Sequence, residues 1–166
     1  MDAIFHRTSI RKYKDRPVEK EKITQILKAA MQAPSACNQQ PWEFYVVTDK
    51  EIIQQLSTTS PYASFTKDAP VIIVSVYKTN GLIAPSYAPI DMSIAQENMW
   101  LETDAQGLGG VWIGTCPQQE RMDAVKQVLH LNDDVQAFSL FALGYPDEEK
   151  QHQDRFDESR IHYVGE

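Results

Sequence analysis

The stretch APVIIVSVY, residues 69–77, is an almost unbroken run of apolar and β-branched side chains. Its length and composition are typical of a strand that is buried on both faces of a sheet. VQAFSLFALGYP, residues 135–146, has the same character and is closed by Gly144 and Pro146. The sequence therefore predicts two buried strands within one sheet.

Shorter strands and amphipathic helices are expected around these two runs. EFYVVT (43–48) and GVWIG (110–114) are rich in the aromatic and β-branched residues that strands favour. Apolar residues at helical spacing predict helices over residues 18–33, 49–58, 90–106 and 118–131. Helices that alternate with strands favour an α/β or α+β class, with helices covering a sheet. In the polar C-terminal segment, RIHYV (160–164) is a candidate last strand.

The helix over residues 90–106 is the longest and the most apolar. Ile90 and Ile94 are expected on its apolar side, so the helix should be interior or should pack on a partner. Its carboxylates are spread around the helix, which favours a solvated face over an acid–base pair; they are Asp91, Glu97, Glu102 and Asp104. Gly107 should end the helix as a left-handed cap.

Composition narrows the class of protein. The chain has 166 residues, a net charge of −7 and a pI near 5.1, which argues against a nucleic-acid surface. No segment approaches the ~18 apolar residues of a membrane span, and the N-terminal segment lacks a signal-peptide core. We expect one domain over residues 1–166, a cytoplasmic location, and free thiols at Cys37 and Cys116.

Several kinds of catalytic centre are disfavoured by spacing. The four histidines do not pair with one another or with cysteine at ligand spacing, so no metal site is expected. No nucleophile elbow surrounds Ser35 or Cys37. GLGGVWIG (107–114) follows a predicted helix and lacks the dinucleotide fingerprint, although its glycines would let a backbone approach a flat ligand. The alternative for this segment is a helix cap followed by a strand.

Two polar segments remain as candidates. RTSIR (7–11) offers two guanidiniums and two hydroxyls within five residues, which suits a phosphate monoester; the alternative is a solvated charged arm. QAPSACNQQPWEF (32–44) places an unusually long polar loop between a helix and a strand. It is either a surface loop or a set of polar groups arranged around a ligand.

Four segments in this order resemble the FMN-dependent nitroreductase family: RTSIRKY (7–13), APSACNQQPWEF (33–44), GLGGVWIG (107–114) and GYP (144–146), with Arg155 downstream. The resemblance covers nearly the whole chain. It implies an α+β fold, a three-layer sandwich with a central mixed sheet flanked by helices. It also implies an intertwined homodimer with two FMN molecules at the interface.

The resemblance assigns expected roles to individual residues. Arg7, Thr8 and Ser9 would hold the FMN phosphate and ribityl chain, Arg155 would complete the phosphate site, and Arg11 would lie near flavin N1 and O2. The loop from the other subunit would lie against the isoalloxazine through Pro34, Ser35, Ala36 and Asn38. A backbone segment would lie near the ring, formed by Val111, Trp112, Ile113 and Gly114.

The chain also departs from the family pattern. Members often carry a lysine just before the strand that begins AP, where this chain has Ser64 and Lys67. Gln153 replaces a second basic residue two positions before Arg155. The chain is short, so the pocket is expected to be open. Three aromatic residues are expected as core or interface anchors: Trp42, Phe44 and Trp100.

The implied function is two-electron hydride transfer from NADH or NADPH, through flavin N5, to nitro compounds, quinones or similar acceptors. No protein acid or base is required for this transfer, and Arg11 would tune the flavin. Two alternatives stay open: other flavin chemistry on the same fold, such as dehalogenation or flavin fragmentation, and flavin binding without turnover.

Overall fold

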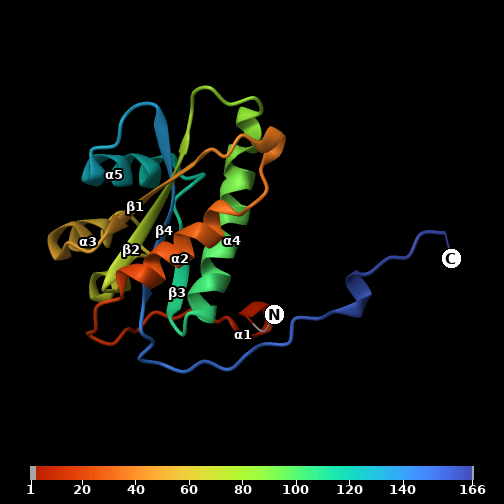
Figure 1. Ribbon diagram of the computed structural model, residues 1–166, viewed down its shortest axis with the longest axis horizontal. Coiled ribbons are helices and arrows are strands. Elements are labelled where there is room, and N and C mark those ends of the chain that lie inside the picture. Colours follow the sequence, from red (N-terminus) through yellow and green to blue (C-terminus); the bar gives the residue numbers. More distant parts are fainter. Residues whose placement is uncertain (1–2, 166) are drawn as a thin grey trace.

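The computed structural model describes residues 3–165 (Figure 1). Its helices are α1 (Ala3–His6), α2 (Lys20–Met31), α3 (Lys50–Leu56), α4 (Ala88–Ala105) and α5 (Gln119–Leu129). Its strands are β1 (Trp42–Val47), β2 (Val71–Lys78), β3 (Gly109–Gly114) and β4 (Val135–Gly144). Short 3-10 turns lie at Ala36–Asn38, Ser64–Asp68, Pro85–Tyr87 and Glu158–Arg160. The predicted helices and internal strands are confirmed to within two residues at most ends.

The sheet has the strand order β1-β2-β4-β3, so the two predicted buried runs lie at its centre. Every pair of neighbouring strands is antiparallel. Parallel pairing within residues 3–165 is limited to one isolated bridge, between Ser9 and Gly110. The mixed sheet expected from the resemblance is therefore, within one chain, an antiparallel sheet with a single parallel bridge at the β3 edge.

Helices cover both faces of the sheet, which confirms the three-layer arrangement (Figure 1). On one face, Ile53 and Leu56 of α3 and Val125 of α5 pack on the central strands. On the other face, α2 and α4 pack against each other and on the sheet through a second cluster that includes Ile26 and Met99. Burial on both faces explains why β2 and β4 have nearly continuous apolar sequences.

The inward face of α4 differs from the predicted one. Ile90 and Ile94 are 55% and 37% exposed. The buried side is formed by residues that recur at helical spacing, namely Met92, Ala95, Gln96, Met99 and Thr103. The Gln96 side-chain oxygen accepts hydrogen bonds from Ser75 and Ser139, one on each central strand, so a polar residue aligns the helix with the sheet. The left-handed cap at Gly107 is confirmed by its φ of 72°.

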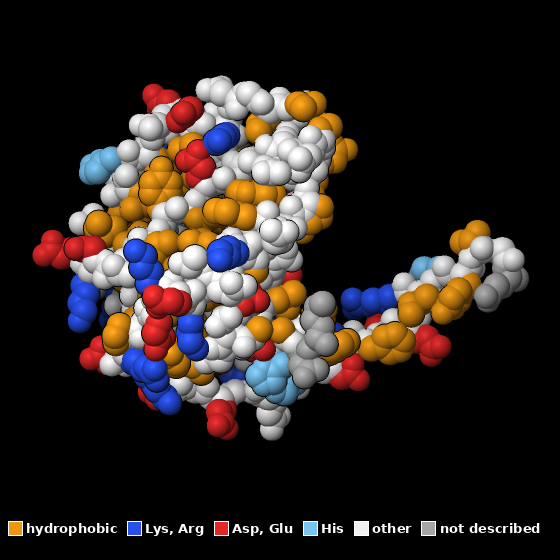
Figure 2. All heavy atoms as spheres, in the orientation of Figure 1, with side chains coloured by type: hydrophobic (Ala, Val, Ile, Leu, Met, Phe, Trp, Pro, Cys, Tyr) orange, Lys and Arg blue, Asp and Glu red, His pale blue; other side chains and the backbone are white. Residues whose placement is uncertain are grey.

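Residues 146–150 still contact the arm that contains Arg11 and Lys12, and beyond residue 152 the chain leaves the body of the molecule as an extended tail (Figure 1). All the hydrogen bonds of residues 153–165 stay within the tail, and RIHYV is not a strand. Hydrophobic side chains are nevertheless displayed along it (Figure 2), with Phe156 74% and Tyr163 72% exposed. The candidate last strand therefore has no pairing partner in the described part of its own chain. No helix between residues 3 and 165 combines the length and apolarity needed to cross a membrane.

Candidate functional site

The basic segment forms an arm, residues 7–13, that lies across the ends of β3 and β4. The N–H of Ile10 donates to the Gly110 carbonyl at 3.1 Å, and Tyr13 forms a bridge with Pro146. The N–H of Lys14 then donates to the Tyr145 carbonyl at 2.9 Å. These backbone contacts hold the arm against the sheet, which argues against the alternative of a loosely solvated arm.

Two glycines of β3 allow the arm and a core ring to approach the strand. A Cβ on Gly109 would lie 2.6 Å from Cγ1 of Ile10, and one on Gly110 would lie 2.6 Å from Cζ of Phe141. The close approach that these glycines permit is therefore with the chain's own side chains. Gly114, by contrast, faces open space and is exposed, so it leaves room for a ligand at that end of the strand.

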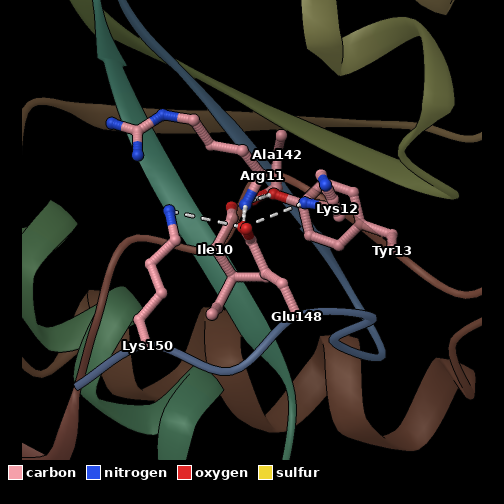
Figure 3. Close-up of polar contacts among 7 residues, drawn as sticks. All are labelled: Ile10, Arg11, Lys12, Tyr13, Ala142, Glu148 and Lys150. Carbon is pink, nitrogen blue, oxygen red and sulfur yellow. Dashed lines mark hydrogen bonds and ion pairs between the residues drawn. The ribbon is translucent and has the colours of Figure 1, made fainter.

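Glu148 and Tyr13 hold the arm at its C-terminal half (Figure 3). The Glu148 carboxylate accepts hydrogen bonds from the N–H groups of Arg11 (2.5 Å) and Lys12 (3.2 Å), and Lys150 pairs with it at 3.4 Å. The buried Tyr13 hydroxyl donates to the Ile10 carbonyl at 2.7 Å, and burial raises its pKa. The Arg11 guanidinium points away from this cluster, so it is free to meet a ligand.

Glu148 was not predicted as a functional residue, because a glutamate in a polar tail carries no local signal of its partners. Burial raises its pKa, but the N–H of Arg11, the Lys150 ammonium and the N–H of Lys12 outweigh burial and leave the pKa below its usual value. A carboxylate with a lowered folded-state pKa stabilises the fold above the unfolded-state pKa of about 4.3. That contribution is lost as the pH falls through the lower folded-state value.

Glu148→Gln is therefore expected to lower the free energy of unfolding at about pH 6 and to differ less from the wild type near about pH 3, where the wild-type carboxylate is losing its charge. Urea unfolding followed by tryptophan fluorescence at both pH values measures this. Glu149→Gln is the matched control, since Glu149 is exposed and makes no hydrogen bond within residues 3–165. If the loss of unfolding free energy in Glu148→Gln stayed constant with pH, the stabilisation would not come from the ionised carboxylate.

Arg7 lies at the other end of the arm, beside α4. Its Cζ atom is 4.0 Å from the centre of the Trp100 ring, and its Nε atom is 3.9 Å from the Glu97 carboxylate. Its Nη1 atom is buried and has no hydrogen-bond partner within residues 3–165. A guanidinium that is shielded from water and only loosely paired favours the arrival of an anion.

The loop after α2 has an unusual backbone. Cys37, Asn38 and Gln40 have φ values of 51°, 52° and 44°, a left-handed conformation that is uncommon for residues other than glycine. Asp91 of α4 holds this loop, because its carboxylate accepts from the N–H of Ala36 (2.9 Å) and from the Gln39 amide (2.6 Å). Such a strained backbone persists only when its surroundings impose it, and it is frequent at functional sites.

Asp91 corrects an expectation from the sequence. It is only 2% exposed and is bonded to the loop, rather than part of a solvated face. The position in α4 gave no signal of this, since the partner loop lies more than fifty residues earlier in the chain. The loop residues that it supports keep accessible surface: Pro34 and Asn38 are exposed, and Ser35 and Ala36 are half-buried.

One chain does not bring the expected site residues together. The arm contacts α4 at Glu97 and Trp100, whereas the loop contacts it at Asp91, six to nine residues away, or about 9–14 Å along the helix. Arg155 is exposed on the tail, where it donates to Gln153 at 3.1 Å. On β3, Val111 and Ile113 are buried in the core, Trp112 is half-buried and Gly114 is exposed.

The structure also shows where the residues lie that differ from the family pattern just before β2. Ser64 and Lys67 lie on the turn Ser64–Asp68 and are exposed, but the ring that faces Arg11 is that of Phe65, 5.9 Å from the guanidinium. Lys67 instead lines a separate cavity of about 760 Å³, between the end of the arm and α3. An aromatic ring thus stands next to the basic side chain expected at the flavin.

This fold and these segments match known proteins. The model of the Nitroreductase family matches residues 4–60 and 56–145. The chain belongs to the nitroreductase family. A relative from Methanothermobacter thermautotrophicus, provisionally named NADH dehydrogenase/NAD(P)H nitroreductase, is 40% identical over 162 residues, covering 98% of this chain and 85% of the relative. The resemblance seen in the four sequence segments is thereby confirmed.

Solved structures agree with this membership. A Clostridium acetobutylicum protein, provisionally named an NADH oxidase, has a TM-score of 0.94 at 45% identity, covering 97% of this chain and 98% of that chain. The FMN-dependent nitroreductase from Clostridium difficile R20291 has a TM-score of 0.90 at 33% identity, covering 97% and 96%. The nitroreductase fold expected for this chain is confirmed.

Proposed function

We propose that this nitroreductase-family chain is an FMN-dependent oxidoreductase that transfers two electrons from NADH or NADPH to small acceptors such as nitro compounds or quinones. The names of its relatives support an NAD(P)H-dependent redox enzyme, and one similar structure is an FMN-dependent nitroreductase. The proposal treats residues 1–166 as a single flavin-binding domain in the cytoplasm. That location suits the two free cysteines.

The rigid arm is the observation that carries the proposal. It presents two guanidiniums and two hydroxyls, and the Thr8 and Ser9 hydroxyls make no hydrogen bond within residues 3–165. Arg7 has an orphaned buried donor, and Arg11 has no ion pair in that part of the chain. Unused donors on a fixed backbone fit a phosphate group and the polar edge of a flavin.

When bound, FMN supplies the site that accepts hydride and passes two electrons on. Arg7, Thr8 and Ser9 would hold its phosphate and ribityl chain, with Arg155 as a further cation. Arg11 would place positive charge beside flavin N1 and O2. Pro34, Ser35, Ala36 and Asn38 would contact the ring from the other subunit, and the backbone of Val111, Trp112, Ile113 and Gly114 would border it.

A homodimer is part of the proposal, because each site needs an arm and a loop that one chain holds apart. Ile90 and Ile94 form an exposed apolar strip on α4, near the loop that Asp91 supports. The tail carries further exposed hydrophobic side chains without a partner in its own chain (Figure 2). Exposed apolar side chains grouped in this way are typical of an interaction surface. A second copy would cover them.

The visible absorbance spectrum of the purified protein, recorded without air, tests the function. We expect a flavin spectrum that bleaches on addition of NADPH or NADH, and that returns when a quinone or nitro compound is added. The nucleotide that bleaches faster identifies the preferred donor. A flavin spectrum that neither nucleotide changes would favour binding without turnover, and no uptake of added FMN would contradict the proposal.

A further inference from the structure

We propose that Trp100 is a positioning residue that fixes the Arg7 guanidinium before a flavin phosphate arrives, and that it thereby makes the site prefer FMN to riboflavin. This inference rests on the proposed function of the arm. From the sequence, Trp100 was expected to be only an anchor in the core or interface. Its contacts in the structure indicate a more specific role.

The Trp100 ring contacts Arg7 with its face and packs edge-on against Phe141. The face carries the Arg7 guanidinium, with Cζ 4.0 Å from the ring centre. The ring packs edge-on with the fully buried Phe141, at 6.0 Å between centres and an angle of 67°. Because Phe141 belongs to the central strand β4, the ring is held by the core of the protein. Trp100 is therefore a rigid platform for a flexible side chain.

The indole N–H argues that Trp100 is not placed there for packing alone. Its Nε1 atom is buried and has no hydrogen-bond partner within residues 3–165. A buried donor without a partner is costly, so phenylalanine or leucine would fill this space at lower cost. Tryptophan has one advantage over these residues, because its ring face attracts a guanidinium more strongly than that of any other aromatic side chain.

The other neighbours of Arg7 hold it less firmly. Glu97 is 3.9 Å away, beyond hydrogen-bond distance, and its side chain is 49% exposed, whereas the Arg7 side chain is only 15% exposed. The stack on Trp100 thus restricts the guanidinium without using its hydrogen-bond donors. Arginine loses much rotamer freedom when it is ordered, so ordering it in advance strengthens the binding of its anion.

The predicted effect is on discrimination between two flavins that differ by one phosphate group. The ratio of the riboflavin Kd to the FMN Kd should fall about tenfold in Trp100→Leu, while the riboflavin Kd changes less than about twofold. Trp100→Phe, which keeps a ring face, should retain the ratio within about threefold. Arg7→Lys keeps the positive charge, but the lysine ammonium is not planar and cannot stack on the ring. The ratio of the two Kd values should therefore fall in this variant too.

Titration of flavin-free protein with FMN and with riboflavin, followed by flavin fluorescence, measures these ratios. Trp42→Phe replaces a buried tryptophan elsewhere in the chain and should leave the ratio unchanged. In an Arg7→Gln background, Trp100→Leu should change the ratio by less than about twofold, because the residue it positions is gone. If Trp100→Leu does not fold, Trp100→Met, which also removes the ring face but keeps more of the side-chain volume, takes its place, and the ratio should fall there as well.

Two results would overturn the inference. Equal weakening of FMN and riboflavin in Trp100→Leu would mean that Trp100 only supports packing. An undiminished ratio in Trp100→Leu, whatever Arg7→Lys does, would mean that the stack does not order Arg7 for phosphate. If the wild-type chain binds neither flavin, the proposed function itself fails and this inference fails with it.

Discussion

Arg11→Leu is expected to slow the reduction of bound FMN by NAD(P)H about a hundredfold, while weakening FMN binding less than about tenfold. The guanidinium has no ion pair within residues 3–165 and points away from Glu148 (Figure 3). Its backbone is fixed by Glu148, so the side chain that carries the charge starts from a defined point on the arm. Positive charge that is fixed where negative charge develops lowers the barrier more than it strengthens binding of the starting state.

Rapid mixing of the FMN-loaded protein with NADPH or NADH, without air, measures the reduction rate, and a flavin titration measures affinity. Arg11→Lys keeps the positive charge and should recover most of the rate. Lys12→Leu removes a neighbouring charge from the same arm and serves as the control for net charge. Reduction rates that are equal in the wild type and Arg11→Leu would contradict the role of Arg11.

A heterodimer of two individually defective chains is expected to recover about half of the wild-type flavin content and activity per dimer. One chain carries Arg7→Gln and Arg11→Leu, which damage the arm. The other carries Asp91→Ala, which removes the carboxylate that holds Ala36 and Gln39. If each site combines the arm of one chain with the loop of the other, one of the two sites contains only intact parts.

Co-expression with two different affinity tags isolates the heterodimer, and its flavin content and NAD(P)H oxidation are compared with those of the two parent homodimers. Both parents should have little flavin, because each has two damaged sites. A heterodimer as inactive as its parents would show that each site is built within one chain. Failure to recover any doubly tagged protein would contradict the dimer itself.

Local sequence was sufficient to predict much of this architecture. The runs 69–77 and 135–146 become the two central strands, and the Gly107 cap acts as expected, because strand burial, helix period and capping depend on neighbouring residues. The family could also be inferred, since the arm and the loop carry polar residues in a recurring order. Those segments were recognisable before any contact between them was known.

Contacts between distant residues were beyond prediction from the sequence. The Glu148 carboxylate meets the arm 137 residues earlier, and Asp91 meets a loop 55 residues away, so neither acid has a local pattern that reveals its partner. The inward face of α4 was likewise decided by packing, which buries Gln96 against Ser75 and Ser139 and leaves Ile90 exposed.

The class of fold, the order of its elements and the residue types available for a phosphate and a flavin follow from the amino-acid sequence. The antiparallel strand order, the acids that hold the arm and the loop, and the stacking of Arg7 on Trp100 depend on the folded chain. The physical reason is the range of the forces involved. Backbone preference and amphipathic period act between near neighbours, whereas hydrogen bonds and ring contacts depend on which distant segments the folded core brings together.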